Sequence, residues 1–286
     1  MNRRQAILKA CLLLRSQAKE ESLAKFLLMY MFDETPQQFS DKLSEELSIE
    51  QENRYFDLIS KNINEDTPLS HLVGFDYFYD RKFKVTKDVL SPRIETEELI
   101  YKVLEYVKNS PKSSFRILDL CTGSGIIAIT LKKEIIEKST EIIASDISSE
   151  ALTVAMENAS YNRANVTFIK SDLFDNISGM FDLIISNPPY ISYKDINTIK
   201  DNVLNYDPHL ALFAEEDGIY FYRKIIENAN QYLENDGAIF LEIGYDQKEK
   251  ILELGKGNNF ITTVYKDING KDRIAYLEYN KIKERR

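Results

Sequence analysis

The sequence predicts an α/β protein in which a mostly parallel, doubly wound sheet follows a small domain of helices. From residue 95 onward, short apolar stretches alternate with longer stretches of helical periodicity, and strands separated by helices form parallel sheets. The first 66 residues show helical patterns only. The last two apolar stretches flank Asn269-Gly270, a turn sequence that favours antiparallel pairing.

Composition excludes several classes of protein. With 286 residues, 43% of them hydrophobic, the chain can bury a sizeable core. A formal net charge of -9 argues against binding that depends on neutralising phosphates. Cys11 and Cys121 are too few for a disulfide framework, and with two histidines they give no zinc-ligand spacing. We therefore expect a cytoplasmic protein with no metal and no direct nucleic-acid binding.

The N-terminal part predicts a helical bundle over residues 1–66. Ala6–Met31 is apolar, but charged side chains between Arg15 and Lys25 interrupt it before it reaches membrane-spanning length, so it predicts an amphipathic helix and no membrane association. Further helical patterns cover Thr35–Leu47 and Ile49–Asn62. Thr67-Pro68 breaks the last helix, because the residue before proline avoids the α region.

A linker, residues 67–94, is expected to hold a hairpin. Tyr77–Phe83 and Lys84–Val89 are short, alternating and rich in aromatic or β-branched side chains, which is typical of strands. This hairpin would connect the helical domain to a larger domain, residues 95–286.

The larger domain is predicted element by element. Helices are expected over Glu95–Val107, Ile126 to about Lys138, Glu150–Arg163 and roughly Gly218–Leu233. Parallel strands are expected at Phe115–Leu120, Glu141–Asp146, Val166–Ser171, Phe181–Ser186 and Ala238–Ile243, followed by an antiparallel pair, Phe260–Lys266 and Arg273–Tyr279. A seven-stranded sheet in this order resembles the Rossmann-like fold of class I S-adenosylmethionine-dependent methyltransferases.

The loop after the first of these strands favours a nucleotide-like ligand. It comprises Cys121, Thr122, Gly123, Ser124 and Gly125, between a strand and a helix, where backbone N–H groups approach a ligand closely. Asp119 on the strand suits a cationic ligand, and S-adenosylmethionine carries an ammonium and a sulfonium.

Two further aspartates follow the next strands. Asp146 is placed to accept hydrogen bonds from ribose hydroxyls, and Asp172 from an adenine amino group. Because ligands of open parallel sheets bind beyond the carboxyl ends of the strands, we expect both aspartates, the loop and Asn187 at one edge.

The tetrapeptide Asn187-Pro188-Pro189-Tyr190 suits methyl transfer to a planar NH2 group. Such a nitrogen is a weak nucleophile, so its two hydrogens must be directed away from the methyl group. The side-chain oxygen of Asn187 and the backbone oxygen of Pro188 are suitable acceptors, and Tyr190 can pack on the acceptor group. The motif alone leaves open adenine in DNA or RNA and the side-chain amide of glutamine.

Five segments together resemble the HemK/PrmC family, which methylates the glutamine of the Gly-Gly-Gln loop in bacterial-type peptide chain release factors. They are Pro68–Gly74, Val89–Glu97, Asp119–Gly125, Asn187–Ile191 and Leu241–Gly244. The resemblance implies S-adenosyl-L-methionine as methyl donor, contacted by Cys121–Gly125, Asp146 and Asn187, with Asp119 supporting its amino end. It also implies that Asn187–Tyr190 clamps the substrate glutamine.

The chain departs from the family pattern at three positions. Cys121 stands where such loops often carry glycine, Leu173 where some members carry an aromatic residue near the adenine, and Ser91 where an aliphatic residue is common. Positive φ at Cys121 would be strained, and Phe174 is a candidate to replace the missing aromatic contact. None of these changes removes a group that the chemistry needs.

The expected partner is a release factor, bound by the helical domain of a monomeric enzyme. Two alternatives remain: an N6-adenine methyltransferase acting on DNA or RNA, and a non-catalytic S-adenosylmethionine-binding partner of the translation machinery. For Arg93, Glu95 and Glu97 we favour a charged helix start over a role in seating the substrate.

Overall fold

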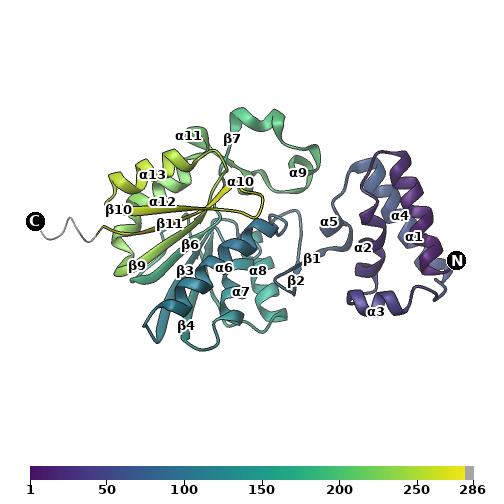
Figure 1. Cartoon of the computed structure of the whole chain (residues 1–286), viewed down its shortest axis with the longest axis horizontal. Coiled ribbons are helices and arrows are strands. Elements are labelled where there is room, and N and C mark those ends of the chain that lie inside the picture. The colour runs from purple at the N-terminus through teal and green to yellow at the C-terminus, as the bar shows by residue number, and fades with distance from the viewer. Residues whose placement is uncertain (281–286) are drawn as a thin grey trace, which may run out of the picture. The chain divides into compact units, whose positions relative to one another are not determined.

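The computed structural model of the protein describes residues 1–280, which divide into two compact units (Figure 1). The first unit comprises Met1–Asp76 together with Lys200–Tyr206. The second comprises Tyr77–Ile199 and the chain from Asp207 onward. Residues 67–76, expected in the linker, and residues 200–206, expected in the larger domain, thus group with the helices.

The first unit is built of short capped helices around an apolar core. Its helices are α1 (Arg3–Ser16), α2 (Ser22–Met31), α3 (Pro36–Asp41), α4 (Ile49–Glu65), α5 (Leu69–Val73) and α9 (Asp201–Tyr206). Asn2, Thr35 and Ser48 begin α1, α3 and α4 with capping boxes, which satisfy backbone N–H groups at the helix starts. The core includes Leu27 and the fully buried Tyr55, whose hydroxyl donates to the Ala24 carbonyl oxygen at 2.8 Å.

Two helix predictions in this unit were wrong. Ala6–Met31 forms two helices, because the chain turns between Ser16 and Ser22 and Ala18 adopts a left-handed φ of 53°. The helix expected over Thr35–Leu47 ends at Asp41. Apolar spacing cannot reveal such turns, since α1 and α2 bury their apolar faces in the same core.

The hairpin exists, but its strands are displaced from the prediction. They are β1 (Phe75–Phe78) and β2 (Arg81–Lys84). The predicted strand Tyr77–Phe83 spans the turn itself, where Tyr79 and Asp80 have φ of 50° and 58°. A two-residue turn with both φ values positive matches the twist of paired strands, and neither residue is a glycine or asparagine that would have signalled it.

The second unit contains the predicted seven-stranded sheet, and the fold class is confirmed. Its order is β10-β11-β9-β6-β3-β4-β5, with β11 antiparallel to both neighbours and the other pairs parallel. The bounds are β3 (Ser114–Leu120), β4 (Ser139–Asp146), β5 (Thr167–Lys170), β6 (Phe181–Ser186), β9 (Leu233–Glu242), β10 (Phe260–Lys266) and β11 (Asp272–Tyr279).

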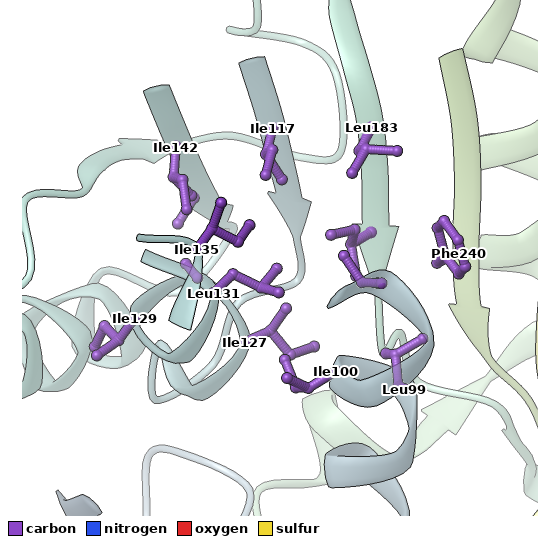
Figure 2. Packing of buried hydrophobic residues seen from close by; sticks show 14 of the residues in the cluster. Leu99, Ile100, Ile117, Ile127, Ile129, Leu131, Ile135, Ile142, Leu183 and Phe240 are labelled. Atoms are coloured by element: carbon purple, nitrogen blue, oxygen red, sulfur yellow. The ribbon is translucent and has the colours of Figure 1, made fainter. Parts of the chain in front are cut away.

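Helices cover both faces of this sheet (Figure 1). On one face lie α6 (Ile94–Asn109), α7 (Ile126–Glu134) and α8 (Ser149–Tyr161), and Figure 2 shows Leu99, Ile100 and Ile127 of α6 and α7 near strand residues Ile117 and Leu183. On the other face, α12 (Tyr220–Asn228) and α13 (Lys248–Gly257) pack on the alternate strand residues. The sheet is therefore buried on both sides, which accounts for its continuous apolar strands.

Two helices end earlier than predicted, and one helix was not predicted. The helix expected to reach about Lys138 ends at Glu134, and Ile135 turns into the core. The helix expected to reach Leu233 stops at Asn228, after which a 3₁₀ turn, η2 (Ala229–Gln231), leads into β9. Helix α13 was not predicted.

The segment after β6 consists of short elements. These are β7 (Ile191–Ser192), η1 (Tyr193–Thr198), α9, α10 (His209–Leu212), β8 (Phe213–Ala214) and α11 (Glu215–Gly218). β7 and β8 pair in parallel and bring the two ends of the segment together. Across the 280 described residues, no helix combines the length and apolar character needed to cross a membrane.

Candidate active site

A cavity of about 360 Å³ opens in the second unit at the carboxyl ends of four parallel strands. Its lining includes Cys121–Ser124 after β3, Asp146 at the end of β4, Asp172 and Leu173 after β5, and Asn187 and Pro189 after β6. The structure thus brings together residues from four separate motifs. Of the other predicted site residues, Asp119, Gly125, Pro188 and Tyr190 lie outside the lining.

The loop after β3 owes its shape to left-handed residues. Cys121, Gly123 and Gly125 have φ of 59°, 54° and 82°. The left-handed φ of Gly125 favours glycine where α7 begins, and a Cβ there would also lie 2.9 Å from the Ile129 Cδ1 atom, so that side chain would have to shift. Cys121 carries the strain of a side chain in this region, about 1 kcal/mol, and burial raises the pKa of its thiol.

Asp146 fixes the loop against β4. One carboxylate oxygen accepts the Gly123 N–H at 2.9 Å, and the other accepts the Ser148 N–H at 2.9 Å. Burial raises the pKa of Asp146, while these backbone donors favour the ionised form. Asp146 lines the cavity, and each of its oxygens can accept a second hydrogen bond, for example from a ligand hydroxyl.

Asp119 lies beneath the loop and is fully buried. Its Oδ2 atom accepts the Thr122 hydroxyl at 2.6 Å and the Ala128 N–H at 3.2 Å. Its Oδ1 atom has no hydrogen-bond partner among the described residues. Burial raises the pKa of this carboxyl to about 7. Asp119 therefore supports the loop from below and does not contact the cavity.

Of the side chains that follow β5, Asp172 and Leu173 line the cavity and Phe174 is buried in the core. Asp172 is exposed and Leu173, with a φ of 43°, lies beside it on the cavity wall. Phe174 points elsewhere: its ring stacks on Tyr232 at a centroid distance of 4.5 Å, within the core. Phe174 therefore does not replace the aromatic contact that is absent at Leu173.

The tetrapeptide after β6 presents Asn187 and Pro189 to the cavity. The Asn187 amide nitrogen lies 3.3 Å from the Thr96 hydroxyl oxygen. The Tyr190 ring packs against the core, and burial raises its pKa to about 12. The Tyr190 carbonyl oxygen accepts the Gln247 side-chain N–H at 2.9 Å, which holds the end of the tetrapeptide.

Sequence reasoning missed a second set of residues at the cavity rim. Asp207 is buried, and its carboxylate accepts the Ser91 N–H at 3.1 Å and pairs with Arg93 at 2.6 Å. This joins the segment before α6 to the start of α10. Glu97 accepts the Tyr79 N–H at 2.8 Å and holds the hairpin turn against α6. From the sequence, Arg93 and Glu97 were expected only as part of a charged helix start, and Asp207 was left without a role.

The residues present fit S-adenosylmethionine. The cavity volume lies within the range of small-molecule sites, and Asp146 and Asp172 offer acceptors for the hydroxyls and amino group of a nucleoside. The Oδ1 atom of Asp119 has no hydrogen-bond partner among the described residues, and a cationic ligand above the loop would favour ionisation of this carboxyl. At Gly123 a Cβ would meet nothing within 4 Å, so a ligand can approach the backbone closely.

Comparison with known proteins agrees with this arrangement. The model of the methyltransferase small domain matches residues 101–208. The release factor glutamine methyltransferase of Lactococcus lactis subsp. lactis is 42% identical over 82% of this chain and 86% of its own. The release factor glutamine methyltransferase of Thermodesulfovibrio yellowstonii is 41% identical over 82% of this chain and 85% of its own.

Solved structures agree with the fold. The crystal structure of a methyltransferase from Pyrococcus furiosus superposes with a TM-score of 0.51 and 17% identity, over 81% of this chain and 98% of that chain. At this identity the likeness concerns the fold alone.

Proposed function

Because this chain belongs to the release factor glutamine methyltransferase family, we propose that it transfers a methyl group from S-adenosyl-L-methionine to the glutamine of the Gly-Gly-Gln motif in peptide chain release factors. The acceptor atom is the side-chain amide nitrogen, N5. The product is a methylated release factor, and the enzyme acts on translation termination.

The cavity residues would hold the methyl donor, which supplies an electrophilic methyl group on a positively charged sulfur. The backbone of Cys121–Ser124 would surround it, with Asp146 accepting from hydroxyl groups and Asp172 from the amino group of the base. Asp119 acts indirectly, through its hydrogen bonds to Thr122 and Ala128. Leu173 would contribute an apolar contact to the flat base.

The tetrapeptide would orient the acceptor amide. The Asn187 side-chain oxygen and the Pro188 backbone oxygen are the two acceptors that would take the hydrogens of the glutamine NH2, which leaves its lone pair free to face the methyl group. Pro188 and Pro189 lack N–H donors, so they offer nothing that would compete for these acceptors. Tyr190 fixes the turn through its ring and carbonyl.

One observation carries the proposal: the cofactor loop and the tetrapeptide begin side by side. Leu120 at the end of β3 pairs with Ser186 at the end of β6. The Ser186 hydroxyl also donates to the Leu120 carbonyl oxygen at 2.7 Å. Cys121 and Asn187 therefore leave adjacent strand ends, so donor and acceptor groups would meet in one cavity.

The test is methyl transfer from labelled S-adenosylmethionine to a purified bacterial release factor. A second copy carries alanine in place of the Gly-Gly-Gln glutamine, and duplex DNA serves as a further substrate. We expect label on the native factor alone. Label on DNA would support the adenine alternative, and cofactor binding without any transfer would support the non-catalytic one.

A variant tests the clamp separately. Asn187→Ala should bind the cofactor within roughly tenfold of the wild type, measured by calorimetry, yet lose transfer by about 100-fold or more, since only an orienting contact is removed. Asn235→Ala is the matched control, because Asn235 is exposed and lies outside the cavity lining. Near-normal turnover by Asn187→Ala would contradict the clamp.

We also propose that the helical N-terminal domain binds the release factor away from the active site, and that a monomeric enzyme works in the cytoplasm without contacting nucleic acid. The first unit has its own apolar core, which suits an independent recognition domain. The net charge of -9 suits a partner with basic, ribosome-binding surfaces. Added salt should therefore raise KM for the release factor, and an unchanged KM would contradict charge recognition.

A further inference from the structure

The segment Leu241–Gly244 has no part in the cofactor loop or in the clamp, yet Glu242 reaches the clamp through one intermediate side chain. Glu242 ends β9 and is 2% exposed, and Thr96 lies in the first turn of α6 and is 1% exposed. The Thr96 hydroxyl lies 2.7 Å from a Glu242 carboxylate oxygen, and the Asn187 amide nitrogen lies 3.3 Å from the Thr96 hydroxyl oxygen. The three side chains form a continuous relay.

The relay has one direction when Glu242 is ionised. A carboxylate only accepts hydrogen bonds, so the single hydroxyl hydrogen of Thr96 must go to Glu242. The Thr96 oxygen then has only lone pairs to offer Asn187, and it accepts from the Asn187 NH2. The amide nitrogen of Asn187 is thereby committed to Thr96, and its carbonyl oxygen is left for another partner.

Orientation matters because the two ends of an amide have opposite hydrogen-bonding character. With its oxygen available, Asn187 can accept a hydrogen from the NH2 of a substrate amide. With the amide reversed, Asn187 would present NH2 to NH2, and neither group could accept. Resting on the proposed function, we propose that Glu242 and Thr96 are positioning residues that fix the Asn187 amide with its oxygen available to the substrate nitrogen.

Glu242 is well placed to serve as the fixed end of the relay. Its own carbonyl oxygen accepts the Tyr222 hydroxyl at 3.0 Å. The next residue, Ile243, donates its N–H to the Arg273 carbonyl oxygen at 2.8 Å and accepts from the Arg273 guanidinium at 3.1 Å. The backbone beneath the carboxylate is therefore held by β11 and α12, so the relay starts from a rigid point.

Protonation supplies an additional readout. Burial raises the pKa of Glu242 to about 7, against the hydrogen bond from Thr96, the charge of Arg273 and the nearby amide of Asn187, which favour ionisation. The titratable and charged groups facing this carboxyl are Glu95, Tyr190, Tyr222 and Arg273. A protonated Glu242 can donate to Thr96, and the relay then loses its fixed direction.

Three variants test the relay by turnover. Glu242→Gln has nearly the same shape but can donate to Thr96, and Thr96→Val removes the hydroxyl. Both should lower kcat on the release factor by roughly 10- to 100-fold, with the Kd for S-adenosylmethionine within about threefold of the wild type. Thr96→Ser keeps the hydroxyl and should retain kcat within about threefold. Wild-type kcat should fall below about pH 7 as Glu242 takes up a proton, and this fall should be absent in Glu242→Gln.

A double-mutant cycle separates positioning from general structural support. If Glu242 acts through Asn187, then Glu242→Gln should lower kcat no further in an Asn187→Ala background. An equal loss in both backgrounds would overturn the proposal. So would a Glu242→Gln enzyme whose kcat lies within about twofold of the wild type.

A measurement that needs neither cofactor nor substrate completes the test. In the free protein, the Asn187 side-chain NH2 should exchange its hydrogens slowly by NMR, since Thr96 accepts from it, and its signals are assigned by their loss in Asn187→Ala. Exchange should accelerate by at least about tenfold in Thr96→Val and stay slow in Thr96→Ser. Unchanged exchange in Thr96→Val would overturn the relay. This readout holds even if the wild type fails to methylate release factors, which would instead refute the proposed function.

Discussion

Gly218 supports the end of the clamp, and replacing it should damage the active site from behind. Its φ is 82°, and a Cβ there would lie 2.2 Å from the Tyr190 carbonyl oxygen and 2.6 Å from the Gln247 Nε2 atom. Those two atoms are hydrogen-bonded at 2.9 Å. The Gly218→Ala variant must therefore move the Tyr190 backbone, separate it from Gln247, or both.

The expected loss of unfolding free energy in Gly218→Ala is the sum of two effects. A left-handed φ costs an alanine about 1 kcal/mol, and displacing well-packed backbone costs about 1–3 kcal/mol more. Gly270→Ala is the matched control: its φ is 77°, but a Cβ there would meet nothing within 4 Å. We expect Gly218→Ala to lose about 2–4 kcal/mol of unfolding free energy, and Gly270→Ala about 1 kcal/mol.

Urea denaturation of both variants measures this difference, and methyl transfer measures its consequence. Gly218→Ala should also lower kcat, because Tyr190 ends the clamp, while its affinity for S-adenosylmethionine stays close to that of the wild type. Equal losses of stability in the two variants would refute the argument from close approach. Full kcat in a destabilised Gly218→Ala enzyme would show that the clamp tolerates displacement of Tyr190.

Three further predictions follow from the site and from the first unit. Asp146→Asn places an NH2 group against the backbone N–H of Gly123 or of Ser148, so calorimetry should show cofactor binding weaker by about 1–3 kcal/mol. Asp175→Asn, an exposed change outside the cavity lining, should bind the cofactor normally. Equal affinities of the two variants would remove Asp146 from the site. Because burial raises the pKa of Asp119 to about 7, the native state holds a proton that the unfolded chain has lost between about pH 4 and 7. Stability from this group is complete below that window and declines as pH rises through it by about 1.4 kcal/mol per pH unit, so Asp119→Asn should reduce the slope measured by urea denaturation, and an unchanged slope would contradict the burial argument. The Tyr206 hydroxyl lies 2.5 Å from the Thr67 hydroxyl, so Tyr206→Phe should lower the opening free energy of residues 200–206 by about 1 kcal/mol. Backbone hydrogen exchange of these residues should become roughly fivefold faster, while exchange in the sheet should not change. Unchanged exchange of residues 200–206 would show that this contact carries no stability.

The sheet was predictable because its strands carry the strongest signals. β6 matches its predicted bounds, Phe181–Ser186, since an apolar run of six residues ends at Asn187-Pro188. The antiparallel pairing of β10 with β11 follows from the turn at Gly270, whose φ is 77°. Strand ends of a parallel sheet share one edge, so the cavity lining after four strands could also be anticipated.

What could not be predicted depends on contacts between distant residues. Asn187 meets Thr96 across 91 positions and Thr96 meets Glu242 across 146, and no periodicity in the sequence records such a meeting. The buried carboxylate of Asp207 likewise has its partners more than 110 positions earlier. The turn at Ala18 was not predicted because residues 17–21 contain no glycine or proline that would have indicated it.

Stability alone does not explain the two carboxylates buried beside this cavity. Burial raises the pKa of both Asp119 and Glu242 to about 7, and each unit of such a shift opposes folding of the ionised form by about 1.4 kcal/mol. Apolar side chains of similar volume would avoid that cost. What an apolar replacement cannot supply is a directed hydrogen bond: Asp119 accepts from Thr122 in the cofactor loop, and Glu242 accepts from Thr96 beside the clamp. Each carboxylate thus orients one of the two groups that methyl transfer must bring together, and the fold retains both at the expense of stability because the reaction depends on direction as well as proximity.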